Sequence, residues 1–323
     1  MHKVSDLVRF LGKVYEKEGI GSCLGTMGVW AITYPYIAYY HNKNGCLNPR
    51  AQNVQGSLMM LDRRDKGLSF DLLCKGIREP YLTAWWQNNL TKADIVYDIG
   101  ANVGYYALQA ARLAGDVVAV EPMPQSYETL RTNMALNHYK NAILFNYAVG
   151  AKEGMVKLYW EKHWNYASVK PATWIKETKN CQDVKLTTVD KLVRMVGMPP
   201  TIIRMDVEGY EIEIIAGAEK TLRDAKRLTI AMELHTGKLA EINYAGMKGM
   251  LQALKGYGFK VVATFKEPHP MLINNRIGTS ALNFMHGLKG NKIGYSNYSI
   301  DDLINSEHFK QLDSGLQVVF RKA

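Results

Sequence analysis

The residues of this chain that are best placed to do chemistry lie where an apolar run meets an acid and a glycine turn. Asp98 follows the run Ile95 to Tyr97, and Gly100 and Gly104 come just after it, before a helical pattern begins. Glycine has no Cβ, so the backbone can turn sharply here and approach a ligand closely. The free amides of such a turn stand at a helix N-terminus and would face that ligand. The pattern predicts a ligand-binding strand–turn–helix unit.

A second acid, Glu121, ends the next apolar run, Val117 to Val120. A carboxylate at this place in a βαβ unit typically accepts hydrogen bonds from the ribose hydroxyls of a nucleotide. The spacing of the turn is G-x-x-x-G, which differs from the G-x-G-x-x-G of dinucleotide-binding enzymes. The charge of Asp98 would also repel a pyrophosphate at this turn. A cationic group, such as the amino group of S-adenosylmethionine, suits Asp98 better. The alternative is a structural βαβ turn with a surface acid.

The elements that would position these acids alternate between strand and helix, which predicts a parallel sheet. Core strands are expected near residues 94–98, 117–120, 142–147, 201–206, 229–234 and 259–264. Helices are expected near residues 103–114, 124–137, 211–223 and 243–256. A last strand is expected over 316–321, and an added strand over 154–160.

The segments around this core are predicted in less detail. Residues 56–70 alternate between apolar and polar types, which predicts a β-hairpin, and helices are expected near 70–75 and 80–89. Residues 161–185 and 266–314 look irregular. Because long loops beside a strand-end crevice usually carry specificity, these two segments are candidates for an acceptor pocket.

At these residues the sequence resembles the FkbM-type methyltransferases. The stretches that carry the resemblance are Tyr97–Tyr106, Tyr147–Gly150, Thr187–Asp190, Arg204–Glu211 with Gly217–Ala218, and Glu233–His235. The resemblance covers about residues 56 to 265. It implies an α/β, Rossmann-like class I methyltransferase fold with a doubly wound, mostly parallel seven-stranded sheet and an antiparallel last strand. It also implies S-adenosyl-L-methionine as methyl donor and, usually, O-methylation of a hydroxyl on a sugar or natural product.

The expected cofactor cradle combines strand-end acids, turn residues and residues near the third strand. Its members are Asp98, Gly100, Ala101, Asn102, Gly104, Glu121, Asn146, Ala148 and Val149. Asn102 either caps the following helix or contacts the cofactor carboxylate, and Asn146 either lies near the adenine edge or ends a strand. Ser168 lies in Tyr-Ala-Ser-Val, which resembles an Ala-Ser segment of the family, and is expected to be a loop contact near the cofactor.

Methyl transfer from a sulfonium needs positioning and at most one or two acid–base groups. Asp206 is expected at the carboxyl end of the fourth strand, where ligands bind in open α/β sheets, and is the first candidate to orient an acceptor hydroxyl or take its proton. Glu208 is either a carboxylate of a first helical turn or a site residue, and His235 is a candidate base. Together with Glu233 these residues could bind Mg or Mn, but the H-x-x-E-H and H-E-x-x-H spacings are absent, so no metal is predicted.

The charge of the chain raises the question of an acidic partner. The 323 residues are 47% hydrophobic and 22% charged, as in an ordinary globular protein, and the formal net charge is +10. This charge suits a phosphorylated glycan, an anionic lipid surface or nucleic acid, or it belongs to a basic enzyme with none of these partners.

The alternatives to a small-molecule or glycan acceptor are disfavoured by particular residues. Amino-methylating nucleic-acid enzymes carry Asn/Asp-Pro-Pro-Tyr/Phe after the fourth strand, whereas this chain has Asp206 to Gly209, whose acids would repel phosphates. A nucleic-acid methyltransferase is therefore the second hypothesis. The non-enzyme hypothesis is a membrane- or complex-associated protein with a degenerate methyltransferase fold. The intact Asp98, glycines and Glu121 argue against it.

The sequence suggests a cytoplasmic protein that is either one large domain or one domain with appendages. The four cysteines are dispersed, no signal-peptide layout begins the chain, and no apolar run is long enough for a membrane span. We expect a helical and aromatic extension over 1–55 and a methyltransferase domain over 56–323, the latter divided into a lead-in (56–93), a core (94–264), an acceptor-side insertion (265–314) and a last strand (315–321). Residues 1–40 either pack on the core or on a second subunit, or make a peripheral membrane contact. The oligomeric state is not predicted.

Overall fold

The computed structural model describes residues 50–62, 68–160, 167–169, 180–234, 237–265, 299–305 and 316–322. Residues 1–40, with their predicted core, subunit or membrane contact, lie outside these ranges. So do His235 and most of the predicted acceptor-side insertion. The division into domains stays a prediction.

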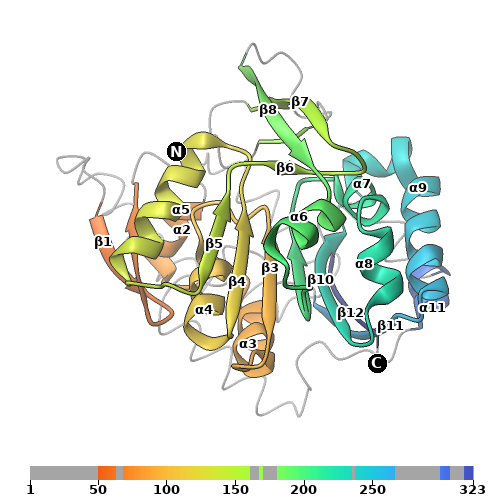
Figure 1. The fold of residues 1–323 in the computed structure, drawn as a ribbon, viewed down its shortest axis with the longest axis horizontal. Coiled ribbons are helices and arrows are strands. Elements are labelled where there is room, and N and C mark those ends of the chain that lie inside the picture. Colours follow the sequence, from red (N-terminus) through yellow and green to blue (C-terminus); the bar gives the residue numbers. More distant parts are fainter. Residues whose placement is uncertain are drawn as a thin grey trace, which may run out of the picture.

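A seven-stranded sheet forms the centre of the described chain (Figure 1), with the order β11–β12–β10–β9–β3–β4–β5. Its strands are β3 (Ile95–Ile99), β4 (Asp116–Val120), β5 (Ala142–Phe145), β9 (Ile202–Met205), β10 (Leu228–Leu234), β11 (Lys260–Phe265) and β12 (Leu316–Lys322). Neighbouring strands pair in parallel except at β12, which lies antiparallel between β10 and β11. The predicted doubly wound sheet with an antiparallel last strand is confirmed.

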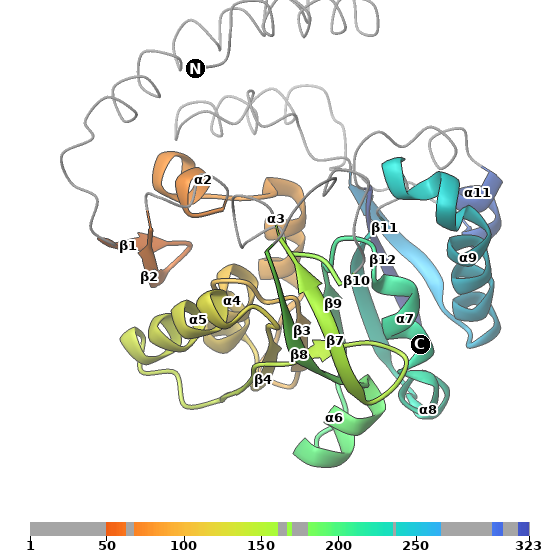
Figure 2. The ribbon, with the colours of Figure 1, turned by 90° about the horizontal axis from the view of Figure 1, so that it is seen from above.

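Helices cover both faces of this sheet (Figures 1 and 2). One face carries α2 (Leu68–Lys75), α3 (Pro80–Asn89), α4 (Tyr105–Leu113) and α5 (Pro124–Leu136). The other carries α6 (Val189–Val196), α7 (Glu211–Ala216), α8 (Glu219–Asp224), α9 (Gly237–Gly256) and α11 (Ile300–Asn305). Successive strand residues enter opposite apolar clusters, as Val117 and Val118 do, because side chains alternate along a strand. Burial on both faces explains the continuous apolar runs of the sequence. No helix among the described residues is both long and apolar enough to cross a bilayer.

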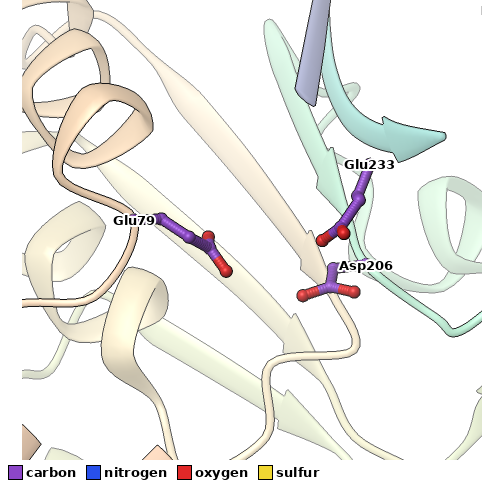
Figure 3. A group of neighbouring side chains, drawn as sticks. All are labelled: Glu79, Asp206 and Glu233. Carbon is purple, nitrogen blue, oxygen red and sulfur yellow. The ribbon is translucent and has the colours of Figure 1, made fainter. Parts of the chain in front are cut away.

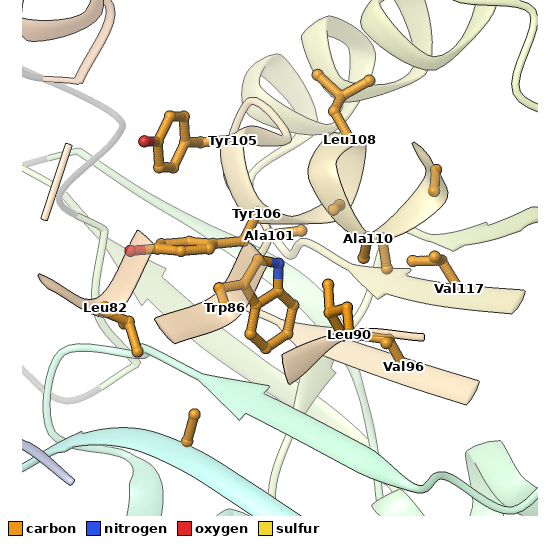
Figure 4. Packing of buried hydrophobic residues seen from close by; sticks show 14 of the residues in the cluster. Leu82, Trp86, Leu90, Val96, Ala101, Tyr105, Tyr106, Leu108, Ala110 and Val117 are labelled. Atoms are coloured by element: carbon orange, nitrogen blue, oxygen red, sulfur yellow. The ribbon is translucent and has the colours of Figure 1, made fainter. Parts of the chain in front are cut away.

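Aromatic side chains fix α3 against the start of α4 (Figure 4). The ring centroids of Trp86 and Tyr106 lie 5.6 Å apart and those of Tyr105 and Tyr106 4.9 Å apart, both pairs edge to face. The Thr83 hydroxyl lies 3.0 Å from the Tyr105 hydroxyl. Edge-to-face pairs are the favoured geometry for buried rings, so the segment before β3 is held firmly on the strand–turn–helix unit.

The hairpin lies earlier than predicted. Its strands are β1 (Arg50–Val54) and β2 (Ser57–Leu61), so the expectation of a hairpin within 56–70 is wrong in its bounds, and the predicted domain boundary at 55/56 falls inside its turn. Gln55 and Gly56 both have positive φ, as a two-residue hairpin turn of type I′ requires. Strand β1 is difficult to predict from the sequence because it contains polar residues such as Gln52 and Asn53. It is defined by its pairing with β2 rather than by its own composition.

A second sheet extends from the end of β5. It has the order β6–β8–β7, with β6 (Ala148–Val149), β7 (Gly154–Tyr159) and β8 (Cys181–Thr187). The added strand near 154–160 is confirmed, whereas the prediction that residues up to 185 are irregular is wrong from Cys181 onwards. Strand β8 has exposed side chains at Cys181, Asp183 and Lys185, and its pairing with β7 defines it better than its own composition does.

The predicted helix over 211–223 is divided into α7 and α8. A Cβ on Gly217 would come 2.0 Å from the carbonyl oxygen of Gly150, so the two backbones can approach only because residue 217 is glycine. This contact packs the helix pair against the smaller sheet. Helix α9 begins at Gly237, earlier than predicted, and α11 is a short helix within a segment predicted to be irregular.

Candidate functional site

A cleft opens at the carboxyl ends of the strands on either side of the point where the strand order reverses, between β3 and β9. This is the place where ligands bind in open α/β sheets. The residues that line it are Leu68, Arg78, Ile99–Asn102, Tyr105, Tyr106, Glu121, Pro122, Tyr147–Val149, Leu158, Ala167, Val169, Arg204, Asp206–Glu208 and Tyr210.

The glycine turn is shaped mainly by contacts within the protein. Gly100 has a φ of +78°, and a Cβ there would come 2.2 Å from the Asp206 carbonyl oxygen. Gly104 has a φ of +99°, and its Cβ would come 2.7 Å from Leu130 Cδ1. Both positions therefore require glycine for the turn and its packing. Gly100, Ala101 and Asn102 line the cleft as predicted, whereas Gly104 is not among the described residues that line it.

The first three amides of this turn are occupied. The N–H groups of Gly100 and Ala101 donate to the Val120 carbonyl at 2.9 and 3.1 Å, and that of Asn102 donates to Glu121 Oε2 at 2.8 Å. The expectation that these amides face a ligand is wrong, because the turn folds over the end of β4 and bonds to it. The backbone of Gly100, Ala101 and Asn102 still lines the cleft, so a ligand there would contact the turn by packing against it.

Glu121 is held by backbone amides from both sides. Its Oε2 accepts from Asn102 and its Oε1 accepts from the N–H of Met123 at 2.8 Å. Glu121 is only 6% exposed, and this burial raises the pKa of its carboxyl group to about 7. Each carboxylate oxygen can accept more than one hydrogen bond, so the amides leave capacity for hydroxyl donors in the cleft.

Arg204 joins two of the predicted acids. Its Nη1 lies 3.2 Å from Asp98 Oδ1 and donates to the Gly100 carbonyl at 3.2 Å, while its Nη2 donates to Asp206 Oδ2 at 2.9 Å. The Tyr106 ring centroid lies 4.5 Å from its Cζ. Burial raises the pKa of Asp98, and the Arg204 guanidinium opposes that rise.

Arg204 is a site residue that we did not single out from the sequence. The signal was available: an arginine within the apolar strand Ile202–Met205 must find acidic partners, because buried arginines almost never lack them. Asp98 is completely buried and is not among the described residues that line the cleft. The sequence predicted the position of Asp98 at the end of the strand, but it did not predict that the side chain is completely buried.

The predicted residues of the third-strand region separate into two groups. Ala148 and Val149 line the cleft from β6. The Asn146 amide instead donates to the carbonyls of Glu121 and Pro122 at 2.8 and 3.0 Å, which ties the ends of β4 and β5 together. This geometry agrees with the strand-ending alternative. The Ser168 hydroxyl donates to the Glu208 carbonyl at 3.3 Å, while its neighbours Ala167 and Val169 line the cleft.

Apolar side chains form the end of the cleft beside the smaller sheet. Tyr147 stacks on Phe145 with ring centroids 5.5 Å apart and planes 22° apart, and Lys185 Nζ lies 5.8 Å above the Tyr147 ring. Leu158 and Val169 line the same end. The cleft therefore has an apolar end and an acidic end, which suits a ligand with a flat ring and a charged tail.

Three acids meet beside the cleft (Figure 3), and of these Asp206 is the one found among the described residues that line it. Glu79, Asp206 and Glu233 each offer a carboxylate oxygen, and these oxygens lie within 4.8 Å of one another. Glu79 Oε2 accepts from the Tyr106 hydroxyl at 2.8 Å, and Glu233 Oε2 accepts from Gln317 Nε2 at 3.0 Å. Glu79 is a second residue that sequence reasoning missed.

The alternative metal set of Asp206, Glu208, Glu233 and His235 is brought together only in part. Asp206 and Glu233 come together, Glu208 lines the cleft but is not in the acidic group, and His235 lies outside the described residues. Acidic groups of this kind are common without an ion, so the group does not identify a metal site. Glu208 has a φ of +54°, which places it in the tight turn between β9 and α7.

Comparison with known families decides which fold family this cleft belongs to. The methyltransferase FkbM domain matches residues 98–261, about half of the chain. The chain belongs to the FkbM methyltransferase family. The matched region begins at Asp98 and contains Glu121, Arg204 and Asp206, so the family domain includes most of the residues that line the cleft but not Leu68, Arg78 or the neighbouring Glu79.

More distant likenesses add detail without fixing a substrate. The hexuronic acid methyltransferase AglP of Haloferax volcanii is 25% identical over 151 residues, which are 45% of this chain. The match spans 57% of that relative's length. The methyltransferase FkbM of Methylobacillus flagellatus KT is similar at 16% identity and a TM-score of 0.36, covering 51% of this chain and 38% of its own. TYW2 of P. horikoshii is similar at 13% identity and a TM-score of 0.44, covering 90% and 81%. Structural likenesses at this level say nothing about what this chain binds.

Proposed function

We propose that this protein is an S-adenosylmethionine-dependent methyltransferase that methylates a hydroxyl on a sugar, glycan, or natural-product or lipid-linked acceptor. The observation that carries the proposal is the position of Glu121. It lies in the cleft at the point where the strand order reverses, held by two backbone amides with acceptor capacity left over. A carboxylate at this strand end suits ribose hydroxyls.

The residues present fit the cofactor in three places. Asp98 does not itself line the cleft, but the Arg204 guanidinium bonds only one of its carboxylate oxygens, so its negative charge would attract an ammonium group bound near the turn. Glu121 would accept from the ribose. The apolar end around Tyr147 and Leu158 would take the adenine, because a flat ring stacks well on an aromatic side chain.

The roles of the chain's own residues follow from their places in the cleft. When bound, S-adenosylmethionine supplies an activated methyl group. Asp206 lies at the end of β9 and lines the cleft, where its carboxylate can orient an acceptor hydroxyl or take its proton. Arg204 holds one oxygen of that carboxylate. Glu208 and His235 remain predicted alternatives for the acid–base role.

Three observations favour a sugar acceptor over other hydroxyl compounds. The curated relative is named for a hexuronic acid, although the match covers only part of it. Carboxylates such as those of Glu79, Asp206 and Glu233 are good acceptors for neighbouring hydroxyl groups, which sugars present in series. Arg78, which lines the cleft and pairs with Glu79 at 2.9 Å, adds a cationic side chain suited to an acidic sugar.

Calorimetry with S-adenosylhomocysteine tests the proposal. We expect the full chain to bind one equivalent, and Glu121→Ala to weaken binding by roughly 1.5–3 kcal/mol, the scale of hydrogen bonds to a charged group. Glu153→Ala, an exposed acid that pairs with Lys191 away from the lining residues, is the matched control and should bind like the wild type. A folded wild-type protein that binds no S-adenosylhomocysteine would overturn the cofactor assignment. Unchanged affinity in Glu121→Ala would overturn the ribose assignment.

A further inference from the structure

We infer that Arg204 is a positioning residue that fixes Asp98 and Asp206 relative to each other, so that cofactor binding at one strand end and acceptor handling at the next depend on one guanidinium. The inference rests on the proposed function and adds a residue to it. Arg204 contacts neither the expected ribose site nor the apolar end of the cleft. It acts through the two carboxylates that it holds.

The register of the sheet places this contact at the reversal of strand order. Asp98 on β3 and Arg204 on β9 are direct partners across the two strands. On either side, Asp98 is paired with Ala119 and Arg204 with Ala231, and both alanines belong to the apolar cluster on this face. The small alanine side chains leave room for the ion pair under the Tyr106 ring. The pair is thus the polar centre of an otherwise apolar row.

An ion pair at this place is not explained by stability alone. Arg204 is 5% exposed and Asp98 is fully buried, and well-packed apolar residues often stabilise a fold as well as a buried ion pair does. The row already contains apolar residues that would pack there. An apolar residue in place of Arg204 could not form the ion pair with Asp206, whose side chain is 17% exposed and lines the cleft.

The geometry uses the fork of an arginine. One terminal nitrogen serves Asp98 and the Gly100 carbonyl, and the other serves Asp206. A lysine would supply the same charge as a single point, without two separate nitrogens at fixed spacing. A lysine variant should therefore keep the neutralising charge and lose part of the positioning.

The charges around Arg204 show what its removal would do. Besides Asp98 and Asp206, the acids that face this group are Glu79 before α3, Glu121 at the end of β4 and Glu233 on β10, and the Tyr106 hydroxyl comes from α4. Without the guanidinium, Asp98 and Asp206 would repel each other and one of them would keep its proton to a higher pH. A protonated Asp98 attracts an ammonium group less strongly.

The test is calorimetric binding of S-adenosylhomocysteine to the full chain and to Arg204→Met and Arg204→Lys. We expect Arg204→Met to bind roughly tenfold or more weakly at about pH 8, and Arg204→Lys to recover part of that loss. The ratio of the dissociation constants of Arg204→Met and wild type should grow as the pH falls toward about 6. Because Asp98 and Asp206 also influence the pKa of Glu121, the same ratio is measured in the Glu121→Gln background, where Glu121 no longer titrates. Arg112→Met, which removes an α4 arginine bonded to the Gln55 carbonyl, is the matched control and should bind like wild type.

A second variant separates positioning from a structural role. Adding Asp206→Asn to Arg204→Met removes the repulsion on Asp98, so the double variant should bind S-adenosylhomocysteine roughly threefold or more tightly than Arg204→Met. If the role of Arg204 were only structural, Asp206→Asn would not restore affinity.

The inference is overturned if Arg204→Met binds within about twofold of wild type. It is also overturned if the loss of affinity is equal at every pH and neither Arg204→Lys nor Asp206→Asn restores affinity. Where Arg204→Met does not fold by circular dichroism, Arg204→Lys and its combination with Asp206→Asn carry the same comparison. Failure of the wild type to bind would instead contradict the proposed function.

Discussion

The two ends of the cleft hold their acids in different ways. At the cofactor end, Glu121 is fixed by the amides of Asn102 and Met123, which lie in or directly after the same βαβ unit. At the acceptor end, Glu79, Asp206 and Glu233 come from three segments far apart in the chain and are fixed by other side chains, Tyr106, Arg204 and Gln317. The difference implies that the cofactor end is set by a local motif, whereas the acceptor end is set by the assembled fold and can change with it.

The largest expected effect separates the two ends by catalysis. With a working acceptor, Asp206→Asn should lower turnover by on the order of a hundredfold while leaving S-adenosylhomocysteine affinity near normal, because the amide cannot take the acceptor's proton. Turnover and binding are measured on the same preparation. If turnover stays within a fewfold of wild type while the melting temperature falls, Asp206 serves the stability of the turn before α7, and the role passes to Glu208 or His235.

The second effect concerns the pH dependence of the cofactor end. Burial raises the pKa of Glu121 to about 7. The ionised carboxylate can accept hydrogen bonds from both ribose hydroxyls, whereas the protonated form has one oxygen occupied by a proton. S-adenosylhomocysteine affinity should therefore rise about tenfold between about pH 6 and pH 8. In Glu121→Gln this rise should be absent. An equal rise in both proteins would assign the titration to another group.

The same carboxyl should also leave a mark on stability. Its pKa in the folded protein is raised above the ordinary glutamate value, so its contribution to stability is fully present below about pH 4.5 and is lost as the pH rises through about 7. Denaturant unfolding without ligand should show wild type losing up to about 3 kcal/mol relative to Glu121→Gln across that window. If the difference in the free energy of unfolding between the two proteins is the same at every pH, the pKa of Glu121 is not raised in the folded protein.

These two ends also show what could be predicted from the sequence. Asp98, Glu121 and the glycine turn lie in one βαβ unit, so spacing along the chain was enough to place them at neighbouring strand ends. The acceptor end could not be assembled in this way, because Glu79 approaches Asp206 only through the packing of α3 on α4. Arg204 was visible as a charge within an apolar strand, but its two partners depend on the register between β3 and β9.

Local sequence also misled where pairing with distant strands decides the structure. The turn amides were expected to be free, yet they bond to the end of β4, which no pattern in the turn itself reveals. Strands β1 and β8 are polar and are defined by their partners β2 and β7. The parallel sheet, by contrast, followed from the alternation of apolar strands and helices, and the antiparallel last strand was what the family resemblance implied.

The smallest expected effect tests whether the N-terminal region belongs to either end. Deleting residues 1–49 should leave S-adenosylhomocysteine affinity within about twofold of wild type, because the described residues that line the cleft begin at Leu68. Deleting residues 1–55 is the sharper comparison, since it removes β1 and leaves β2 unpaired, and should lower the melting temperature further. A folded 50–323 protein that no longer binds would show that the N-terminal residues complete the site.

The most direct test of the account is a crystal structure of the full chain with S-adenosylhomocysteine. The account predicts the ligand in the cleft between β3 and β9, with its ribose hydroxyls within hydrogen-bond distance of the Glu121 carboxylate and its adenine at the apolar end beside Tyr147. A ribose placed away from Glu121, or a ligand bound outside this cleft, would contradict it.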